Sequence, residues 1–146
     1  MNKRIGIIGS GTAGLQLAFS LKNDFDVTLL HEEPDEIRSG RIQSTQVYFR
    51  PTLEREQRFH MPETDVAPSI KTIHFNMGRE KLFVGRLTGA ATSVDQRMAF
   101  SEAMDKLVQH GVRFRKARVF RNEIKSLAES YELSGTGYHF IHRSAA

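Results

Sequence analysis

Residues 4–21 read RIGIIGSGTAGLQLAFSL, an apolar run followed by closely spaced glycines and then by a second apolar stripe. The run Ile5–Ile8 predicts a buried strand, and the stripe that begins at Leu15 predicts a helix. Between them, Gly9, Gly11 and Gly14 stand at GxGxxG spacing. A strand, a glycine turn and a helix in this order are typical of a dinucleotide-binding site.

Each glycine of GSGTAG has a separate role in such a site. Gly9 permits the tight turn, Gly11 lets the backbone approach a pyrophosphate, and Gly14 lets the helix pack closely on the strand. The helix N-terminus, including Thr12 and Ala13 of the motif, offers free N–H groups and a partial positive charge to phosphates. We therefore expect these five residues to bind the cofactor.

The residues after the first helix extend the pattern to a complete βαβ unit. The run Asp26–Leu30 predicts a second strand, and acidic residues follow it directly. A carboxylate at the end of this strand would accept hydrogen bonds from an adenosine ribose, about 20 residues after the glycines. His31 stands one position before the acids, so either Glu32 or Glu33 could fill this role.

Composition limits the classes of protein that this chain can belong to. Its 146 residues suffice for one ordinary core, and with 39% hydrophobic and 26% charged residues it reads as a globular protein with no membrane span. No signal peptide is expected, because the glycine motif begins where a leader would end. The chain has no cysteine, which excludes a thiolate nucleophile or a cysteine metal site and favours a cytoplasmic location.

The net charge of +4 is concentrated in the basic segment from Arg113 to Arg121. Basic residues interleaved with Phe114 and Phe120 allow a nucleic-acid interface as one interpretation. The alternation Val-Arg-Phe-Arg from Val112 is also typical of an edge strand with Phe inside and Arg outside, and we favour this second interpretation. We expect no nucleic-acid partner.

The rest of the chain divides into an irregular segment and a second ordered one. Pro51, Pro62 and Pro68 interrupt residues 41–92, where 54–58 predict a short polar helix and 70–75 and 81–87 predict a β-hairpin around Gly78. Ser93 and Gln96 stand at the spacing of a capping box, which predicts a helix that Gly111 ends. Its predicted buried stripe comprises Phe100, Ala103, Met104, Leu107 and Val108.

Two further features lie near the end of the chain. A helix is expected from 122 to 131, with Ile124, Leu127 and Ala128 facing inward. His139 and His142 are three residues apart and could share a helix face, but no acid or third histidine stands at a ligand spacing. We expect them in a mobile tail and expect no metal site.

The order of these segments resembles the N-terminal part of flavin-dependent monooxygenases of the styrene monooxygenase type. The resemblance covers residues 4 to about 133 and is carried by the glycine motif, by DVTLL followed by PDE and SGR, by Arg55-Glu56, by SVDQR and by LAESYEL. The implied fold is α/β, with a Rossmann-like parallel sheet and an inserted β-hairpin region. We expect a discontinuous FAD-binding domain of residues 1–42 and 93–133, an excursion of 43–92 and a divergent tail of 134–146.

The resemblance also implies a reaction and its components. Such oxygenases receive reduced FAD from a separate flavin reductase and transfer oxygen to a small aromatic substrate, an alkene or indole, through a C4a-peroxyflavin. The glycines and Glu32 would hold the ADP half of FAD, and Arg41, Ser44 and Thr45 would lie near the flavin. Ser44 departs from the family pattern, which has Asn at this position. No catalytic residue is assigned, because enclosing and orienting the flavin requires no obligatory acid, base or nucleophile from the protein.

The sequence departs from the family pattern again after Leu133, where SGTGYHFIHRSAA replaces a buried strand and further flavin-binding motifs. We therefore expect the chain to be incomplete relative to the family and inactive on its own. An exposed sheet edge would then favour self-association into a homo-oligomer. The alternative is a non-catalytic module that binds an adenine dinucleotide, or the remnant of a truncated gene.

Overall fold

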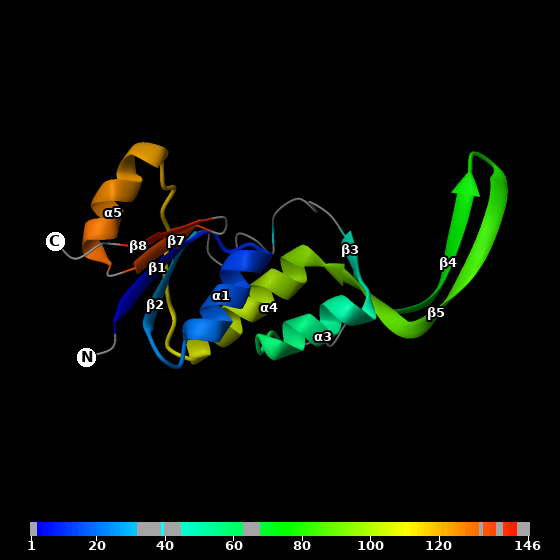
Figure 1. The fold of residues 1–146 in the computed structure, drawn as a ribbon, viewed down its shortest axis with the longest axis horizontal. Helices are drawn as coiled ribbons and strands as arrows, with labels where there is room; N and C mark the ends of the chain where they lie inside the picture. The colour runs from blue at the N-terminus through cyan, green and yellow to red at the C-terminus, as the bar shows by residue number, and fades with distance from the viewer. Residues whose placement is uncertain are drawn as a thin grey trace.

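The computed structural model describes residues 3–31, 39, 45–62, 68–131, 133–136 and 139–142. Helices and strands alternate along the first part of the chain, and a long hairpin separates them from a second ordered part (Figure 1). The elements are β1 (Arg4–Ile8), α1 (Thr12–Leu21), β2 (Asp26–Leu30), β3 (Thr45–Tyr48), α3 (Arg50–Arg58), β4 (Ser69–Met77), β5 (Glu80–Asp95), α4 (Gln96–Gln109), β6 (Arg113–Arg115), the 3₁₀ helix η1 (Arg121–Glu123), α5 (Ile124–Ser130), β7 (Leu133–Thr136) and β8 (His139–His142).

The larger sheet has the strand order β6-β2-β1-β7-β8. Strand β1 pairs in parallel with β2 and with β7, β2 pairs in parallel with β6, and only β8 is antiparallel to its neighbour. Parallel neighbours need long crossover connections, and α1 provides the one between β1 and β2. The predicted α/β class with a parallel sheet is confirmed, as is the βαβ unit at its centre.

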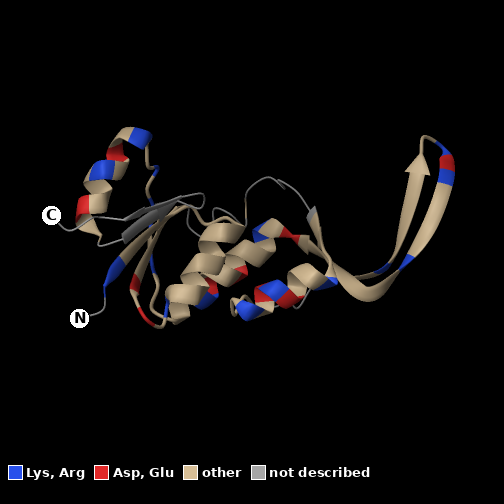
Figure 2. Ribbon diagram, viewed as in Figure 1, with Lys and Arg blue, Asp and Glu red and all other residues tan. Residues whose placement is uncertain are grey.

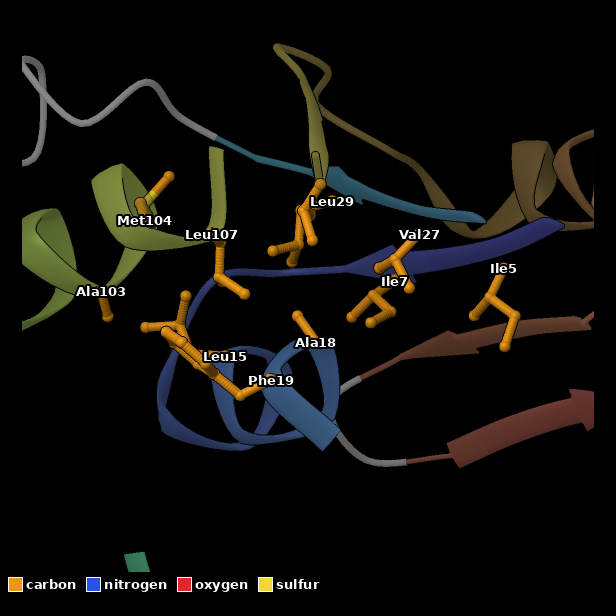
Figure 3. Packing of buried hydrophobic residues seen from close by; sticks show 11 residues of the cluster. Ile5, Ile7, Leu15, Ala18, Phe19, Val27, Leu29, Ala103, Met104 and Leu107 are labelled. Atoms are coloured by element: carbon orange, nitrogen blue, oxygen red, sulfur yellow. The ribbon is translucent and has the colours of Figure 1, made fainter. Parts of the chain in front are cut away.

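The core lies on one face of this sheet, under α1 and α4. Ile5 and Ile7 alternate with Gly6, and the register places them beside Val27 and Leu29 of β2. Figure 3 shows side chains from these strands and from both helices converging in one cluster. Its helical members are Leu15, Ala18, Phe19, Ala103, Met104 and Leu107. A continuous apolar face of this kind holds α1, which follows the glycine turn, and α4, which follows the hairpin, on the same side of the sheet.

On the opposite face of the sheet, the space beside Gly6 is too small for a side chain. A Cβ at this position would lie 2.8 Å from the ring of Tyr131, which follows α5. Ile124, Leu127 and Ala128 are the half-buried residues of α5, and its other residues are exposed. The predicted inward face of this helix is therefore confirmed.

Strand β6 lies at the edge of the larger sheet. Arg113 and Arg115 are exposed, and Phe114 is half-buried against the core. An Arg113 Nη atom lies 2.7 Å from a carboxylate oxygen of Asp26. The interpretation of the Val-Arg-Phe-Arg stretch as an edge strand with Phe inside and Arg outside is confirmed. Figure 2 shows further basic residues in η1 and α5 beyond it.

The start of α4 differs from the predicted capping box. Strand β5 continues through Ser93 to Asp95, because β3 pairs with it from Thr45 opposite Asp95 to Tyr48 opposite Thr92. Ser93 therefore has extended backbone, and the N-cap is Asp95, whose carboxylate accepts a hydrogen bond from the Arg97 N–H at 3.0 Å. The prediction of a capping box formed by Ser93 and Gln96 is therefore wrong.

The predicted buried stripe of α4 also needs one correction, at Val108. Ala103, Met104 and Leu107 are buried, and Phe100 packs against the core cluster. Val108 is 52% exposed. The helix presents Leu107 to the sheet, and the adjacent residue, turned about 100° around the axis, faces solvent. Gly111 follows the helix with φ +85°, as expected of a left-handed residue at a helix end.

The predicted hairpin is confirmed and is longer than expected. Strands β4 and β5 pair antiparallel around a turn with Gly78 at φ +59°, and β3 completes a three-stranded sheet. Figure 1 shows the end of the hairpin extending away from the helices. Phe75 and Phe83 stack across it with ring centroids 5.2 Å apart, although both rings are more than half exposed.

Helix α3 agrees with the prediction of a short polar helix at 54–58 but begins earlier, at Arg50, with Pro51 in its first turn. Proline is tolerated there because the first N–H groups of a helix have no partner within it. No helix within the described residues is long and apolar enough to cross a membrane.

The predicted tail contains two strands. Leu133–Thr136 pairs with β1, and His139–His142 pairs with Thr136–Leu133. The expectation of a mobile tail, or of a helix face shared by His139 and His142, is wrong for these residues. Backbone pairing of β7 with β1, and of β8 with β7, forms these strands independently of the side-chain pattern.

Candidate functional site

The glycine turn lies between the carboxyl end of β1 and the first turn of α1. Gly9 has φ +97°, a left-handed conformation that L side chains rarely adopt, and its N–H donates to the Leu30 carbonyl at 3.1 Å. The turn is thereby joined to the end of β2. This edge of a parallel sheet, outside the carboxyl ends of its strands, is where nucleotides bind in such folds.

Gly14 and Gly11 differ in the space around them. A Cβ at Gly14 would collide with the carbonyl oxygen of Gly9, so α1 can approach the turn this closely only with glycine here. Among the described residues, a Cβ at Gly11 would meet no atom within 4 Å beyond its chain neighbours. Within that part of the chain, the turn is closed on its inner side at Gly14 and open beside Gly11, which is the arrangement that a pyrophosphate requires.

Hydrogen-bonding groups at this turn are available to an anion. Gly11 is the N-cap of α1 and has no side chain that could accept a hydrogen bond from the first N–H groups of the helix. Ser10 is 2% exposed, and its hydroxyl has no hydrogen-bond partner among the described residues. Buried hydroxyls nearly always have a hydrogen-bond partner, so the Ser10 hydroxyl could donate a hydrogen bond to an anion bound at the turn.

The residues predicted to bind the cofactor fall into two groups. Gly9, Gly11, Thr12, Ala13 and Gly14 all lie on the turn or in the first turn of α1. Glu32, Glu33, Arg41 and Ser44 lie outside the described residues. Thr45 begins β3, where its backbone pairs with Asp95. The structure therefore brings together the phosphate-binding part of the predicted site.

A polar cluster next to the turn was not predicted from the sequence. Tyr48, at the end of β3, is hydrogen-bonded to the side chains of Thr12 and Gln96. Glu56, on α3, is hydrogen-bonded to Gln16, one turn beyond Thr12 on α1. These contacts join β3, α3 and α4 to the first two turns of the helix that follows the glycines.

The electrostatics of this cluster follow from its partial burial. Burial raises the pKa of the Glu56 carboxyl above its usual value, against the smaller opposite effect of the hydrogen bond from Gln16. Burial, together with the Glu56 carboxylate, raises the pKa of the Tyr48 hydroxyl. Tyr48 is thus a neutral phenol at physiological pH. Neither residue shows a sequence signal beyond the Arg55-Glu56 pair, because their neighbours come from α1 and α4.

The cluster borders a cavity of about 230 Å³. Thr12, Tyr48 and Glu56 line it together with apolar side chains that include Leu53, Met61, Val94 and Phe100. The cavity lies between α1, α3, α4 and the end of β5. Part of the Thr12 side chain therefore faces a space separate from the open side of Gly11.

Comparison with known sequences identifies relatives of this chain. No family model matches the sequence. Styrene monooxygenase StyA from Pseudomonas sp is 33% identical over 141 residues, and the StyA protein from Pseudomonas fluorescens is 32% identical over the same length. Each match covers 91% of this chain and 33% of the relative. The chain thus spans about a third of the length of the relatives it matches.

Solved structures with the same fold include several oxygenases. The p-nitrophenol 4-monooxygenase PnpA from Pseudomonas putida aligns with a TM-score of 0.61 at 16% identity, over 80% of this chain and 32% of that one. The peptidyl tryptophan dihydroxylase QhpG aligns with a TM-score of 0.60 at 20% identity, over 82% and 26%. At these identities the likeness concerns the fold. The resemblance to styrene monooxygenases is confirmed: this chain is a sequence relative of StyA, matching a third of its length, and it has the fold of one part of such oxygenases.

Proposed function

We propose that this chain is the FAD-binding portion of a flavin-dependent monooxygenase of the styrene monooxygenase type. The observation that carries the proposal is the glycine turn, closed at Gly14 and open at Gly11, in a chain related to StyA. Gly9, Gly11, Thr12, Ala13 and Gly14 would hold the pyrophosphate through backbone N–H groups at the start of α1. Glu32 or Glu33 would hold the ribose, and Arg41, Ser44 and Thr45 would lie near the flavin.

The fit of an FAD pyrophosphate to these residues is supported by three features of the turn. The backbone at Gly9 is left-handed, the space outside Gly11 is open, and the buried Ser10 hydroxyl has no partner among the described residues. When bound, reduced flavin would supply oxygen-transfer chemistry. The chain's own contribution is to bind the phosphates, orient the dinucleotide and shield its inner side with α1.

The resemblance to styrene monooxygenases supports a proposal for the other components of the reaction. A separate flavin reductase would supply reduced FAD, and a small aromatic alkene or indole would be the acceptor of oxygen. The second candidate function is a module that binds an adenine dinucleotide without catalysis. The match leaves two thirds of StyA without a counterpart in these 146 residues. We propose that these residues alone do not catalyse oxygen transfer.

A titration of the purified chain with FAD, NAD and ADP tests the binding proposal. Calorimetry and flavin fluorescence should show FAD binding that ADP displaces, since both share the pyrophosphate and the adenosine. Failure of all three to bind would refute a working phosphate site. NAD binding much tighter than that of FAD would favour a different cofactor.

A reductase-coupled assay with styrene or indole separates the two candidate functions. The expected result is no product above a control without this chain. Product above that control would show that the chain is an active oxygenase and would overturn the non-catalytic alternative.

We also propose that the chain self-associates through exposed strand edges. Strand β4 is the last strand of the three-stranded sheet, and Phe75 and Met77 on it are 52% and 70% exposed. Unpaired edges with apolar side chains are templates for pairing with another chain. Sedimentation at high concentration should show dimers or larger species, and a clean monomer would count against this proposal.

A further inference from the structure

The cavity between α1, α3 and α4 has the character of a small-molecule site in its own right. We propose that it binds one uncharged aromatic molecule that carries a hydrogen-bond donor, of the size of phenol. Its walls are mostly apolar side chains from these helices and β5, and Thr12, Tyr48 and Glu56 supply polar atoms. Concave apolar sites with a few convergent polar groups are the usual form of ligand pockets.

The size of the cavity matches one aromatic ring with a substituent. A cavity of about 150 Å³ lined by Leu, Ile and Phe is enough to bind benzene in another protein. The present cavity measures about 230 Å³ and includes Phe100 and Met61 in its lining. An aromatic ring bound there would lie beside Phe100 and Met61, and both side-chain types pack favourably on aromatic rings.

The polar part of the cavity selects for a neutral donor. The Glu56 carboxyl is half-buried, and a hydrogen bond from Gln16 on α1 lowers its pKa. The two oxygens of a carboxylate can accept several hydrogen bonds, so Glu56 can also accept one from a ligand O–H or N–H. Tyr48 and Thr12 add hydroxyls to the lining of the cavity. Glu56 would repel an anionic ligand. A ligand without a hydrogen-bond donor would displace water from this carboxylate and offer it no hydrogen bond in return.

This site does not depend on the dinucleotide proposal. The cavity is bounded by Ala99, Phe100 and Ala103 of α4, whereas the phosphate site is the open side of Gly11. Binding in the cavity forms no covalent bond and needs no co-reactant. A test on the nucleotide-free chain therefore leaves the two proposals to succeed or fail separately.

Titration of the nucleotide-free full chain with phenol, toluene and benzoate, followed by amide NMR shifts, tests the proposal. Phenol should give saturable shifts at Thr92, Val94 and Phe100. Toluene has the same ring without the donor and should bind about 10-fold more weakly, the equivalent of one hydrogen bond to a charged group. Benzoate should bind more weakly than toluene.

Two variants with matched controls locate the ligand. Ala99→Leu adds side-chain volume to the lining and should weaken phenol binding at least about 10-fold, as one steric overlap in a filled pocket would. Met98→Leu is the control, because Met98 is the neighbouring residue and is 46% exposed. If Ala99→Leu does not fold, the carboxylate variant below still decides the proposal.

Glu56→Gln keeps the shape of the side chain and removes its charge. The preference for phenol over toluene should fall from about 10-fold to about 3-fold, because a neutral acceptor makes a hydrogen bond roughly half as strong. Glu54→Gln on the exposed side of α3 should leave the preference unchanged. Equal binding of phenol and toluene by the native chain, shifts that do not saturate, or phenol binding unaffected by a folded Ala99→Leu variant would each overturn the proposal.

Discussion

The same substitution at two glycines of the turn should damage two different properties. Gly14→Ala places a Cβ against the carbonyl oxygen of Gly9, and that oxygen belongs to backbone that cannot rotate away. Gly11→Ala places a Cβ where none of the described residues beyond its chain neighbours has an atom within 4 Å. We therefore expect the first change to reduce stability and the second to reduce nucleotide binding while the fold is retained.

The expected magnitudes follow from the local geometry. Overpacking destabilises a protein by about 1–3 kcal/mol, and contact with rigid backbone favours the upper end of this range. Gly14 lies in the first turn of α1, where alanine's better helix propensity returns at most about 1 kcal/mol. Gly14→Ala should thus lower the free energy of unfolding by about 2 kcal/mol. At Gly11 the loss of a favoured N-cap residue and the gain from a less flexible unfolded chain are each about 0.5–1 kcal/mol and nearly cancel.

Urea denaturation and calorimetric titration with ADP measure the two effects on the same proteins. Gly11→Ala should keep the native urea midpoint within error and weaken ADP binding by about 10-fold or more, equivalent to at least about 1.4 kcal/mol. Gly14→Ala should shift the midpoint downward. The reasoning is refuted if Gly14→Ala is as stable as the native chain, or if Gly11→Ala binds ADP with native affinity where the native chain binds it.

Three further predictions concern stability. Leu107→Ala, at a fully buried side chain of α4, should lower the free energy of unfolding by about 2–5 kcal/mol, while Val108→Ala should lower it by less than about 1 kcal/mol. Equal losses in urea denaturation would contradict the burial of Leu107 and the exposure of Val108. Asp95→Ala removes the N-cap side chain of α4 and should lower the free energy of unfolding by about 1 kcal/mol, whereas Ser93→Ala should not weaken this cap. A lower urea midpoint for Ser93→Ala than for Asp95→Ala would instead support the capping box of Ser93 and Gln96. Folding raises the pKa of Glu56, so its contribution to stability is complete below the unfolded value near 4.5 and is lost as the pH rises through the folded pKa. The native chain should therefore lose stability relative to Glu56→Gln across that pH interval. A stability difference that stays constant with pH would show that no such shift exists.

Local sequence signals predicted the elements whose causes are local. The strand at Asp26–Leu30 and the hairpin around Gly78 agree with the structure because a short apolar run and a glycine turn are properties of adjacent residues. The start of α4 was misplaced because Ser93 pairs with Val47, 46 positions away in the chain. A backbone partner at such a distance leaves no mark on the residues around Ser93.

The sequence alone determined the βαβ unit and its glycine turn, since GxGxxG, the preceding strand and the following helix lie within 27 residues and each glycine has a steric reason of its own. Only the tertiary structure revealed the cavity and the cluster of Tyr48, Glu56 and Thr12. Those residues come from three elements, and their contacts depend on how α3 and β3 pack against α1. Packing of this kind is decided by the whole core, which no short stretch of sequence contains.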